Sequence, residues 1–175
     1  MAFTDFPTYR GRMEYVCLDC AARYPGDSLL YTCPQCGGVF LLENLDFARL
    51  KERSGQEWRQ LFDDRCASRS TALRGIFRYY ELLAPLLDED DIVYLGEGIT
   101  PVVEASAALR DTVGAAFAYK NDGQNPSASF KDRGMACAFS YLKWLCRRNQ
   151  WDEVLTVCAS TGDTSAAAAL YASYV

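Results

Sequence analysis

Residues 119–134, YKNDGQNPSASFKDRG, are the stretch that decides the fold. A strand-like run ends here, and a loop rich in Asn, Gly and Pro leads to Ser129, whose hydroxyl can cap a helix. Lys131 then falls in the first helical turn, where the positive end of the helix dipole disfavours its charge. The neutral amine is the form that traps carbonyl groups, so Lys131 is a candidate catalytic residue. The alternative is an ordinary surface lysine at a helix start.

Two further loops have a similar composition. Residues 158–165, CASTGDTS, follow a strand-like run and open a second predicted helix. Small hydroxyl residues and a glycine at a helix N-terminus can form an anion-binding nest, so this loop can receive a carboxylate or a phosphate. A capping loop without a ligand is the alternative. Residues 95–101, LGEGITP, place Thr100 beside a rigid proline.

Strand-like and helix-like segments alternate along residues 92–175. The sequence predicts strands over residues 92–95, 115–120 and 154–159. It predicts helices over residues 102–109, 129–148 and 164–174. Alternation of this kind favours an α/β fold with a parallel sheet.

Residues 43–91 have a helical pattern and form a linker or the start of the larger domain. The predicted helices cover residues 44–53, 56–63 and 76–87. In the last of them an apolar stripe at helical spacing consists of Phe77, Tyr80, Leu83 and Leu87. Pro85 ends or kinks this helix. The acidic run over residues 88–91 is predicted to be a solvated linker.

Residues 1–42 form a separate N-terminal module, in which residues 1–14 are an extended lead. Two CxxC pairs, separated by 12 residues, consist of Cys17, Cys20, Cys33 and Cys36. Each CxxC turn can present two thiolates to one ion, so the spacing predicts a tetrahedral zinc site in a zinc ribbon. Because the protein supplies all four ligands, the zinc is structural. A ribbon that has lost its metal or carries disulfides is the alternative.

The composition excludes several functions. The chain of 175 residues contains no histidine, which excludes Ser-His-Asp and Cys-His catalysis. A net charge of −5 does not favour binding to nucleic acid or to an anionic membrane. The N-terminus has no apolar signal-peptide core, so we expect a cytoplasmic protein with reduced thiols. The remaining cysteines are predicted to be small core residues: Cys66, Cys137, Cys146 and Cys158.

Three motifs together resemble a known family. LGEGITP, KNDGQNPSASFKDRG and CASTGDTSAA, in this order, are similar to the threonine synthase family of pyridoxal-phosphate enzymes of fold type II. The resemblance covers residues 92–175, and the ribbon resembles the one found in some bacterial and archaeal members. It implies a three-layer lyase fold with a parallel sheet. The fold is expected to be incomplete, because the sequence stops within a helix-forming alanine run and the family's cofactor-phosphate loop is not found.

The resemblance also implies roles for single residues. Lys131 matches the lysine that forms an aldimine with pyridoxal 5'-phosphate. Asp163 matches a position, Asn in most of the superfamily, that contacts the 3-hydroxyl oxygen of the cofactor. The loop that receives the substrate carboxylate corresponds to Ser160, Thr161 and Thr164. Asp132 and Arg133 are expected to brace the helix.

The reaction implied is the conversion of O-phospho-L-homoserine and water to L-threonine and phosphate. The amine of Lys131 moves the protons, and the full-length protein is a possible homodimer. The 175 residues alone are expected to bind the cofactor poorly and to be inactive. Two alternatives remain open, a lyase that resembles threonine or serine dehydratase and a non-catalytic zinc-ribbon protein with a degenerate lyase domain.

Overall fold

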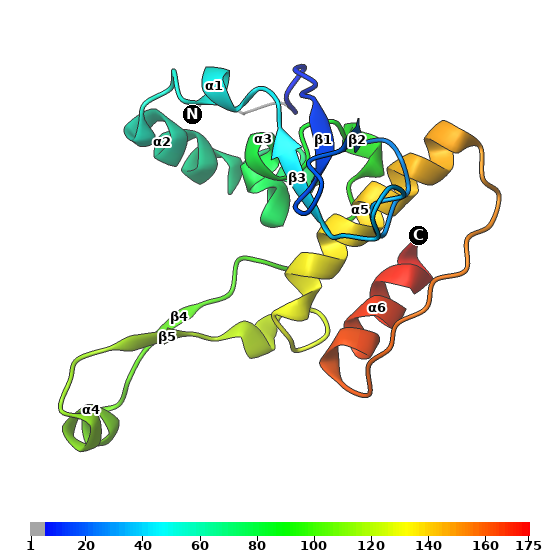
Figure 1. Cartoon of the computed structure of the whole chain (residues 1–175). Helices are drawn as coiled ribbons and strands as arrows, with labels where there is room; N and C mark the ends of the chain where they lie inside the picture. Colours follow the sequence, from blue (N-terminus) through cyan, green and yellow to red (C-terminus); the bar gives the residue numbers. More distant parts are fainter. Residues whose placement is uncertain (1–5) are drawn as a thin grey trace.

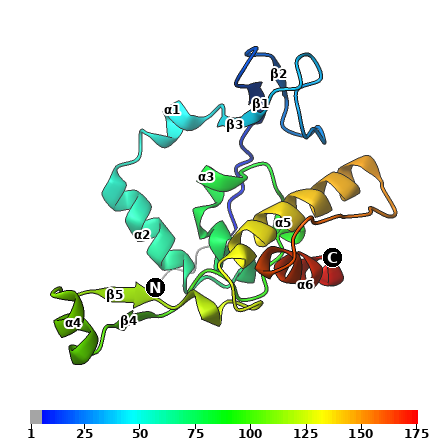
Figure 2. The same ribbon diagram turned by 60° about the horizontal axis from the view of Figure 1, so that its bottom comes forward.

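The computed structural model describes residues 6–175, and the first part of the predicted extended lead, residues 1–5, lies outside the described residues. Figure 1 shows the three-stranded cysteine-rich region beside one long helix, α5 (Lys131–Asn149). Helix α6 (Asp163–Tyr174) lies beside α5 in Figure 1 and in Figure 2. An arm projects from this body and consists of β4 (Val102–Glu104), α4 (Ala107–Val113) and β5 (Ala118–Lys120).

The ribbon is a three-stranded antiparallel sheet. Its strands are β1 (Met13–Cys17), β2 (Arg23–Pro25) and β3 (Phe40–Asn44), in the order β2-β1-β3. Tyr15 of the central strand faces Tyr24 on one side and Leu42 on the other. The residues between β2 and β3 form no strand.

The helical region is more broken than the sequence pattern predicts. It contains α1 (Phe47–Leu50), α2 (Gly55–Arg65), α3 (Tyr80–Leu83) and 3-10 turns at Thr71–Leu73, Ile76–Tyr79 and Glu89–Asp91. Helix α2 begins where predicted, because Ser54 and Glu57 form a capping box. The helix predicted over residues 44–53 shrinks to α1. Helix α3 ends at Leu83 because Pro85 cannot continue it.

Two apolar clusters hold these elements on α5. The first joins the predicted stripe to α5 and contains Leu73, Phe77, Tyr80, Leu87, Trp144 and Leu145. The second joins α5 to α6 and contains Val93, Ala136, Phe139 and Tyr171. The burial of Phe77, Tyr80 and Leu87 confirms most of the stripe. Both clusters use α5, which is therefore the central element of the body.

The mixed α/β class is confirmed, but the described strands pair only in antiparallel fashion. Residues 102–104, predicted to begin a helix, form β4, which pairs with β5. Residues 92–95 form no strand, and the Val93 N–H donates to Ser140 Oγ at 2.8 Å.

The segment at 154–159, predicted as a buried strand, is extended and exposed. Leu155 and Val157 are 88% and 87% exposed. A strand needs a neighbour to satisfy its backbone groups, and no described strand lies beside this segment.

The acidic run over residues 88–91 is not a solvated linker. Asp91 is only 1% exposed, and Arg147 of α5 pairs with both Asp88 and Asp91. Only Asp91 of the run is buried, and its pairing with Arg147 makes this possible, since a buried carboxylate needs a charged partner.

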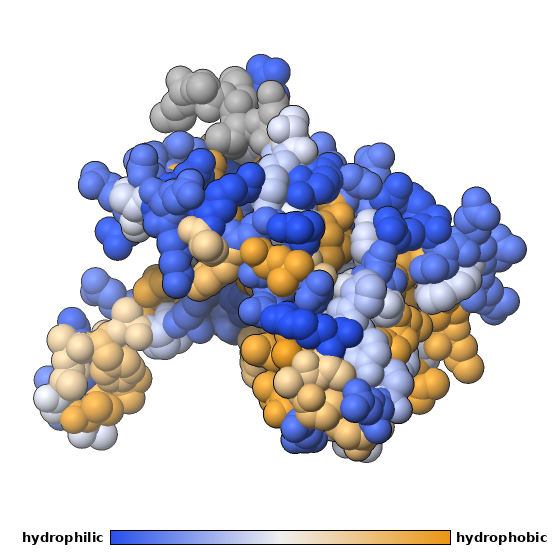
Figure 3. Space-filling model, turned by 45° about the horizontal axis from the view of Figure 1, so that its top comes forward, coloured by the Kyte–Doolittle hydropathy of each residue, from blue (hydrophilic) through white to orange (hydrophobic). Residues whose placement is uncertain are grey.

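Apolar side chains cover much of the projecting arm, which lies at the lower left of Figure 3. Val102, Val113 and Tyr119 are among its exposed residues. Among the helices of residues 6–175, none has the length and apolar character needed to cross a membrane.

Candidate functional site

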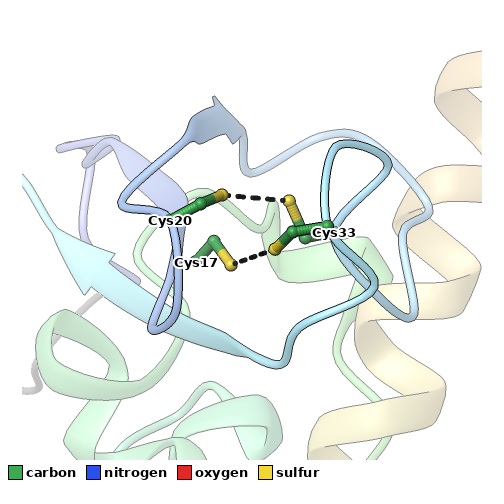
Figure 4. Close-up of side chains that lie close together, drawn as sticks. Cys17, Cys20 and Cys33 are labelled. Atoms are coloured by element: carbon green, nitrogen blue, oxygen red, sulfur yellow. Dashed lines mark hydrogen bonds between the residues drawn. The ribbon is translucent and has the colours of Figure 1, made fainter.

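The four cysteines predicted to bind a metal lie together in the ribbon. Their sulfur atoms all lie within 4.8 Å of one another. Figure 4 shows the side chains converging, with 3.4 Å between the sulfurs of Cys17 and Cys36 and 3.6 Å between those of Cys20 and Cys33. Four sulfurs at about 2.3 Å from a zinc ion would lie about 3.8 Å apart, so the cluster has the size of a zinc site.

Backbone geometry shapes the two CxxC turns. The Ala21 N–H donates to the Cys17 carbonyl at 3.0 Å, and the Gly37 N–H donates to the Cys33 carbonyl at 2.8 Å. Gly37 has a φ of +76°, which favours glycine. A side chain at Gly38 would place its Cβ 3.1 Å from the Cys17 sulfur. Glycine at both positions therefore suits the geometry of the second turn.

The surroundings of Cys33 favour the thiolate, the form that binds metals. Burial alone would raise the pKa of its thiol, but hydrogen bonds from the Tyr24 hydroxyl and from backbone amides lower this pKa to about 6. The same hydrogen bond to Cys33, with some burial, raises the pKa of Tyr24 to about 12. Tyr24 therefore stays protonated and acts as a donor to the sulfur, at 3.6 Å.

Lys131 is the first residue of α5, at the helix start that the sequence predicts. Ser129 Oγ accepts the Lys131 backbone N–H at 3.3 Å, although Phe130 occupies the N-cap position. The Lys131 Nζ lies 4.3 Å from the centre of the Phe130 ring. Within residues 6–175 this amine forms no ion pair, so no carboxylate competes for it.

The two residues after Lys131 brace the helix, as predicted. The buried Asp132 carboxylate accepts hydrogen bonds from the Ser127 N–H and hydroxyl at 2.7 and 2.6 Å. Arg133 donates twice to Asp122, at 2.8 Å each, and Thr100 Oγ1 donates to Asp122 at 2.7 Å. The Arg133 guanidinium holds the pKa of Asp122 down at about 2. These bonds fix the loop before Lys131 against the LGEGITP loop.

Glu97, which sequence reasoning did not single out, is fully buried within the LGEGITP loop. Its Oε2 accepts hydrogen bonds from the Tyr171 hydroxyl and the Leu95 N–H, both at 3.0 Å. The bond to Tyr171 ties the loop to α6. The only local sequence feature that distinguishes Glu97 is its place between Gly96 and Gly98, which both have positive φ.

The candidate substrate loop lies at the start of α6, which begins at Asp163. Ser160 and Thr164 are partly buried, whereas Thr161 and Asp163 are exposed. Figure 1 shows α5 and α6 side by side, with both helices starting toward the lower end of the view. The structure thus brings Lys131 and this loop to the N-termini of adjacent helices. Within the described part of the chain, no hydrogen bond or ion pair joins Lys131 to residues 160–164.

The cysteines outside the ribbon behave in two ways. Cys137 packs against the main apolar cluster, as predicted, and burial raises the pKa of its thiol to about 11. Cys66 and Cys158 are exposed, so their prediction as core residues is wrong. Cys66 follows the last turn of α2, and Cys158 lies in the unpaired extended segment.

Comparison with known proteins finds similarity to one enzyme family over the part of the chain that contains Lys131. Residues 93–175 match the family model described as pyridoxal-phosphate dependent enzyme.

The chain is also similar to threonine synthases. That of Methanocaldococcus jannaschii is 36% identical over 156 residues, which are 89% of this chain and 34% of the relative. That of Synechocystis is 43% identical over 100 residues, 57% of this chain and 25% of the relative. Threonine synthase 2 of Arabidopsis thaliana, a chloroplastic protein, is 35% identical over 156 residues, 85% of this chain and 28% of the relative. The chain spans about a quarter to a third of the length of these relatives.

Proposed function

We propose that this protein has threonine synthase activity and converts O-phospho-L-homoserine and water to L-threonine and phosphate. The observation that carries the proposal is the amine of Lys131 at the start of α5, which forms no ion pair within residues 6–175 and lies in the segment that matches the pyridoxal-phosphate enzyme family. The similarity to several threonine synthases supports this reaction over that of a dehydratase.

The residues present fit pyridoxal phosphate. Lys131 would hold the cofactor, because no carboxylate of residues 6–175 engages its amine, and Asp163 would contact the cofactor. When bound, the cofactor supplies an electron sink for the substrate carbons. The Lys131 amine would then move protons among the α, β and γ carbons of the substrate, which suits a chain without histidine.

The hydroxyl loop fits the substrate carboxylate. Ser160, Thr161 and Thr164 surround the N-terminus of α6, where backbone N–H groups and the helix dipole favour an anion. Ser160 Oγ already accepts the Gly162 N–H at 3.4 Å, which orders this turn. We therefore propose these three residues as the substrate-binding set.

Replacement of the lysine tests the proposed activity. In the full-length protein, Lys131→Ala should abolish phosphate release from O-phospho-L-homoserine and the visible absorbance of the bound cofactor. Lys143→Ala is the matched control, because Lys143 lies on the same helix, away from its N-terminus. Activity and absorbance that survive in Lys131→Ala would contradict the proposal. Turnover of free threonine in place of the phosphorylated substrate would favour a dehydratase.

We also propose that Cys17, Cys20, Cys33 and Cys36 bind one structural zinc ion. Metal analysis should find about one zinc per chain, and Cys33→Ser should lose it and melt at a lower temperature, because structural zinc contributes folding energy. Cys66→Ser, which changes an exposed thiol outside the ribbon, should keep the zinc. An unchanged melting temperature after chelation would contradict the proposal.

The remaining proposals concern the setting of this activity. We propose an N-terminal module over residues 1–42, a helical linker over 43–91 and the lyase part over 92–175. The expected partner is a small-molecule substrate, with no nucleic acid or membrane, and the full-length protein is proposed to be a homodimer. Free thiols suited to metal binding support a reducing, cytoplasmic location.

A further inference from the structure

The ribbon contacts α5 through a small polar interface. The Tyr141 hydroxyl of α5 lies 2.7 Å from the Gly26 carbonyl, 3.2 Å from the Ser28 carbonyl and 2.9 Å from the Tyr15 hydroxyl. About two turns further along α5, Arg148 pairs with Asp27 at 2.7 Å. Both side chains of α5 therefore contact the same short segment of the ribbon, residues 26–28.

The hydrogen bonds at Tyr141 have a defined direction. A phenol carries one proton, and the shortest contact shows that Tyr141 donates it to the Gly26 carbonyl. Tyr15 must then donate to the Tyr141 oxygen. Burial raises the pKa of Tyr141, so the hydroxyl remains a donor. A phenylalanine at this position would remove both bonds and keep the ring.

A continuous set of contacts leads from this interface to the cysteine cluster. The Tyr15 ring packs on Phe40 at 5.1 Å, and Phe40 packs on Tyr24 at 5.6 Å between ring centres. The Tyr24 hydroxyl lies 3.6 Å from the Cys33 sulfur. Tyr141 is therefore connected to a metal-ligand candidate through three aromatic side chains of the ribbon.

The segment at residues 26–28 also depends on the cluster through the backbone. It joins β2 to the second CxxC turn, and residues 26–32 belong to no strand or helix. Without a cation, thiolates within 4.8 Å of one another repel, which works against holding the two turns together. Metal binding thus favours the position of the segment that Tyr141 and Arg148 contact.

The opposite end of the same helix carries the candidate catalytic lysine. Helix α5 runs without a break from Lys131 to Asn149, and Figure 1 shows it crossing the body from the ribbon to the region of the arm. A continuous helix moves largely as one element, so contacts at Tyr141 and Arg148 restrict where its N-terminus lies.

We propose that Tyr141 is a positioning residue that couples metal binding in the ribbon to the placement of α5. The inference rests on the proposed zinc site. Coupling between two equilibria, here zinc binding and the placement of α5, is reciprocal. A change at Tyr141 must therefore alter the affinity for zinc, although no hydrogen bond joins Tyr141 to a cysteine among the described residues.

The test compares zinc affinity in Tyr141→Phe and in the wild type by competition with a chromophoric chelator. One or two lost hydrogen bonds should weaken zinc binding about 3- to 10-fold. Tyr31→Phe is the matched control, because this ribbon tyrosine is 84% exposed, and it should bind zinc as the wild type does. Hydrogen exchange provides the second measurement, in which zinc removal from the wild type should speed exchange in α5 as well as in the ribbon.

Equal zinc affinity in Tyr141→Phe and the wild type would overturn the coupling and leave the zinc site in place. A wild type that binds no zinc would overturn both. Arg148→Met, which removes the second contact, should also weaken zinc binding, and circular dichroism should show native helix content in both variants. Exchange in α5 that does not respond to zinc would likewise overturn the proposal.

Discussion

At the scale of single residues, two ion pairs show how burial decides what an ion pair contributes to the free energy of unfolding. Arg65 donates to both oxygens of Glu81, at 2.7 and 2.5 Å, and also to the Arg78 carbonyl at 2.6 Å. Both partners of this pair are buried between α2 and α3. Arg23 and Glu43 form an equally direct pair on the exposed face of the ribbon.

Glu81→Ala should lower the free energy of unfolding by about 3 kcal/mol, because it leaves the Arg65 guanidinium buried without its counter-ion. Glu43→Ala removes an exposed pair and should cost less than about 1 kcal/mol. Urea denaturation of the two variants measures the difference. Equal losses would show that the Arg65 site admits enough water to screen the charge.

Sequence reasoning at the residue scale succeeded where the interaction is local. The CxxC spacing brings its own ligands together, and Ser129 lies within two residues of the N–H that it accepts. The Glu97–Tyr171 bond joins residues 74 positions apart, and no local pattern indicates it. Partners that are distant in sequence depend on how whole elements pack.

At the scale of elements, the termini set by a capping box or a proline were predictable, and strand pairing was not. Ser54 caps α2 with Glu57, and Pro85 lies just beyond the end of α3, because these effects act within a few residues. Residues 102–104 have helix-compatible neighbours, yet they form β4 because β5 offers a ladder partner.

Residues 154–159 are the opposite case, a predicted strand that does not form. Their apolar composition predicts a buried strand, but burial and pairing require neighbouring strands that the described residues do not supply. The segment nevertheless leads to the hydroxyl loop at the start of α6, so the helix predicted after it is present although the strand is not.

At the scale of the whole molecule, one cluster of charges joins three distant parts of the chain. Arg147 of α5 contacts Asp91 at 2.8 and 2.6 Å and Asp88 at 2.5 Å. Arg10, in the N-terminal lead, contacts the other oxygen of Asp88 at 2.8 Å. The lead, the 3-10 turn at Glu89–Asp91 and the long helix are thereby held together.

Arg147→Met should destabilise the protein by about 1–2 kcal/mol near neutral pH. The buried Asp91 carboxylate would lose the partner that contacts both of its oxygens. The loss of stability stays moderate because Arg147 itself is half exposed, so water screens its charge. Hydrogen bonds from Arg10 and Arg147 hold the pKa of Asp88 below its ordinary 3.8. Because this pKa is lowered in the folded state, the stabilisation is present above about pH 4 and is lost as the pH falls further.

The difference in melting temperature between wild type and Arg147→Met should therefore shrink in acid. The control Arg110→Met, in the exposed arm, should differ little from the wild type at any pH. A difference that stays constant down to pH 3 would show that Arg147 acts through packing of its alkyl chain and not through these carboxylates.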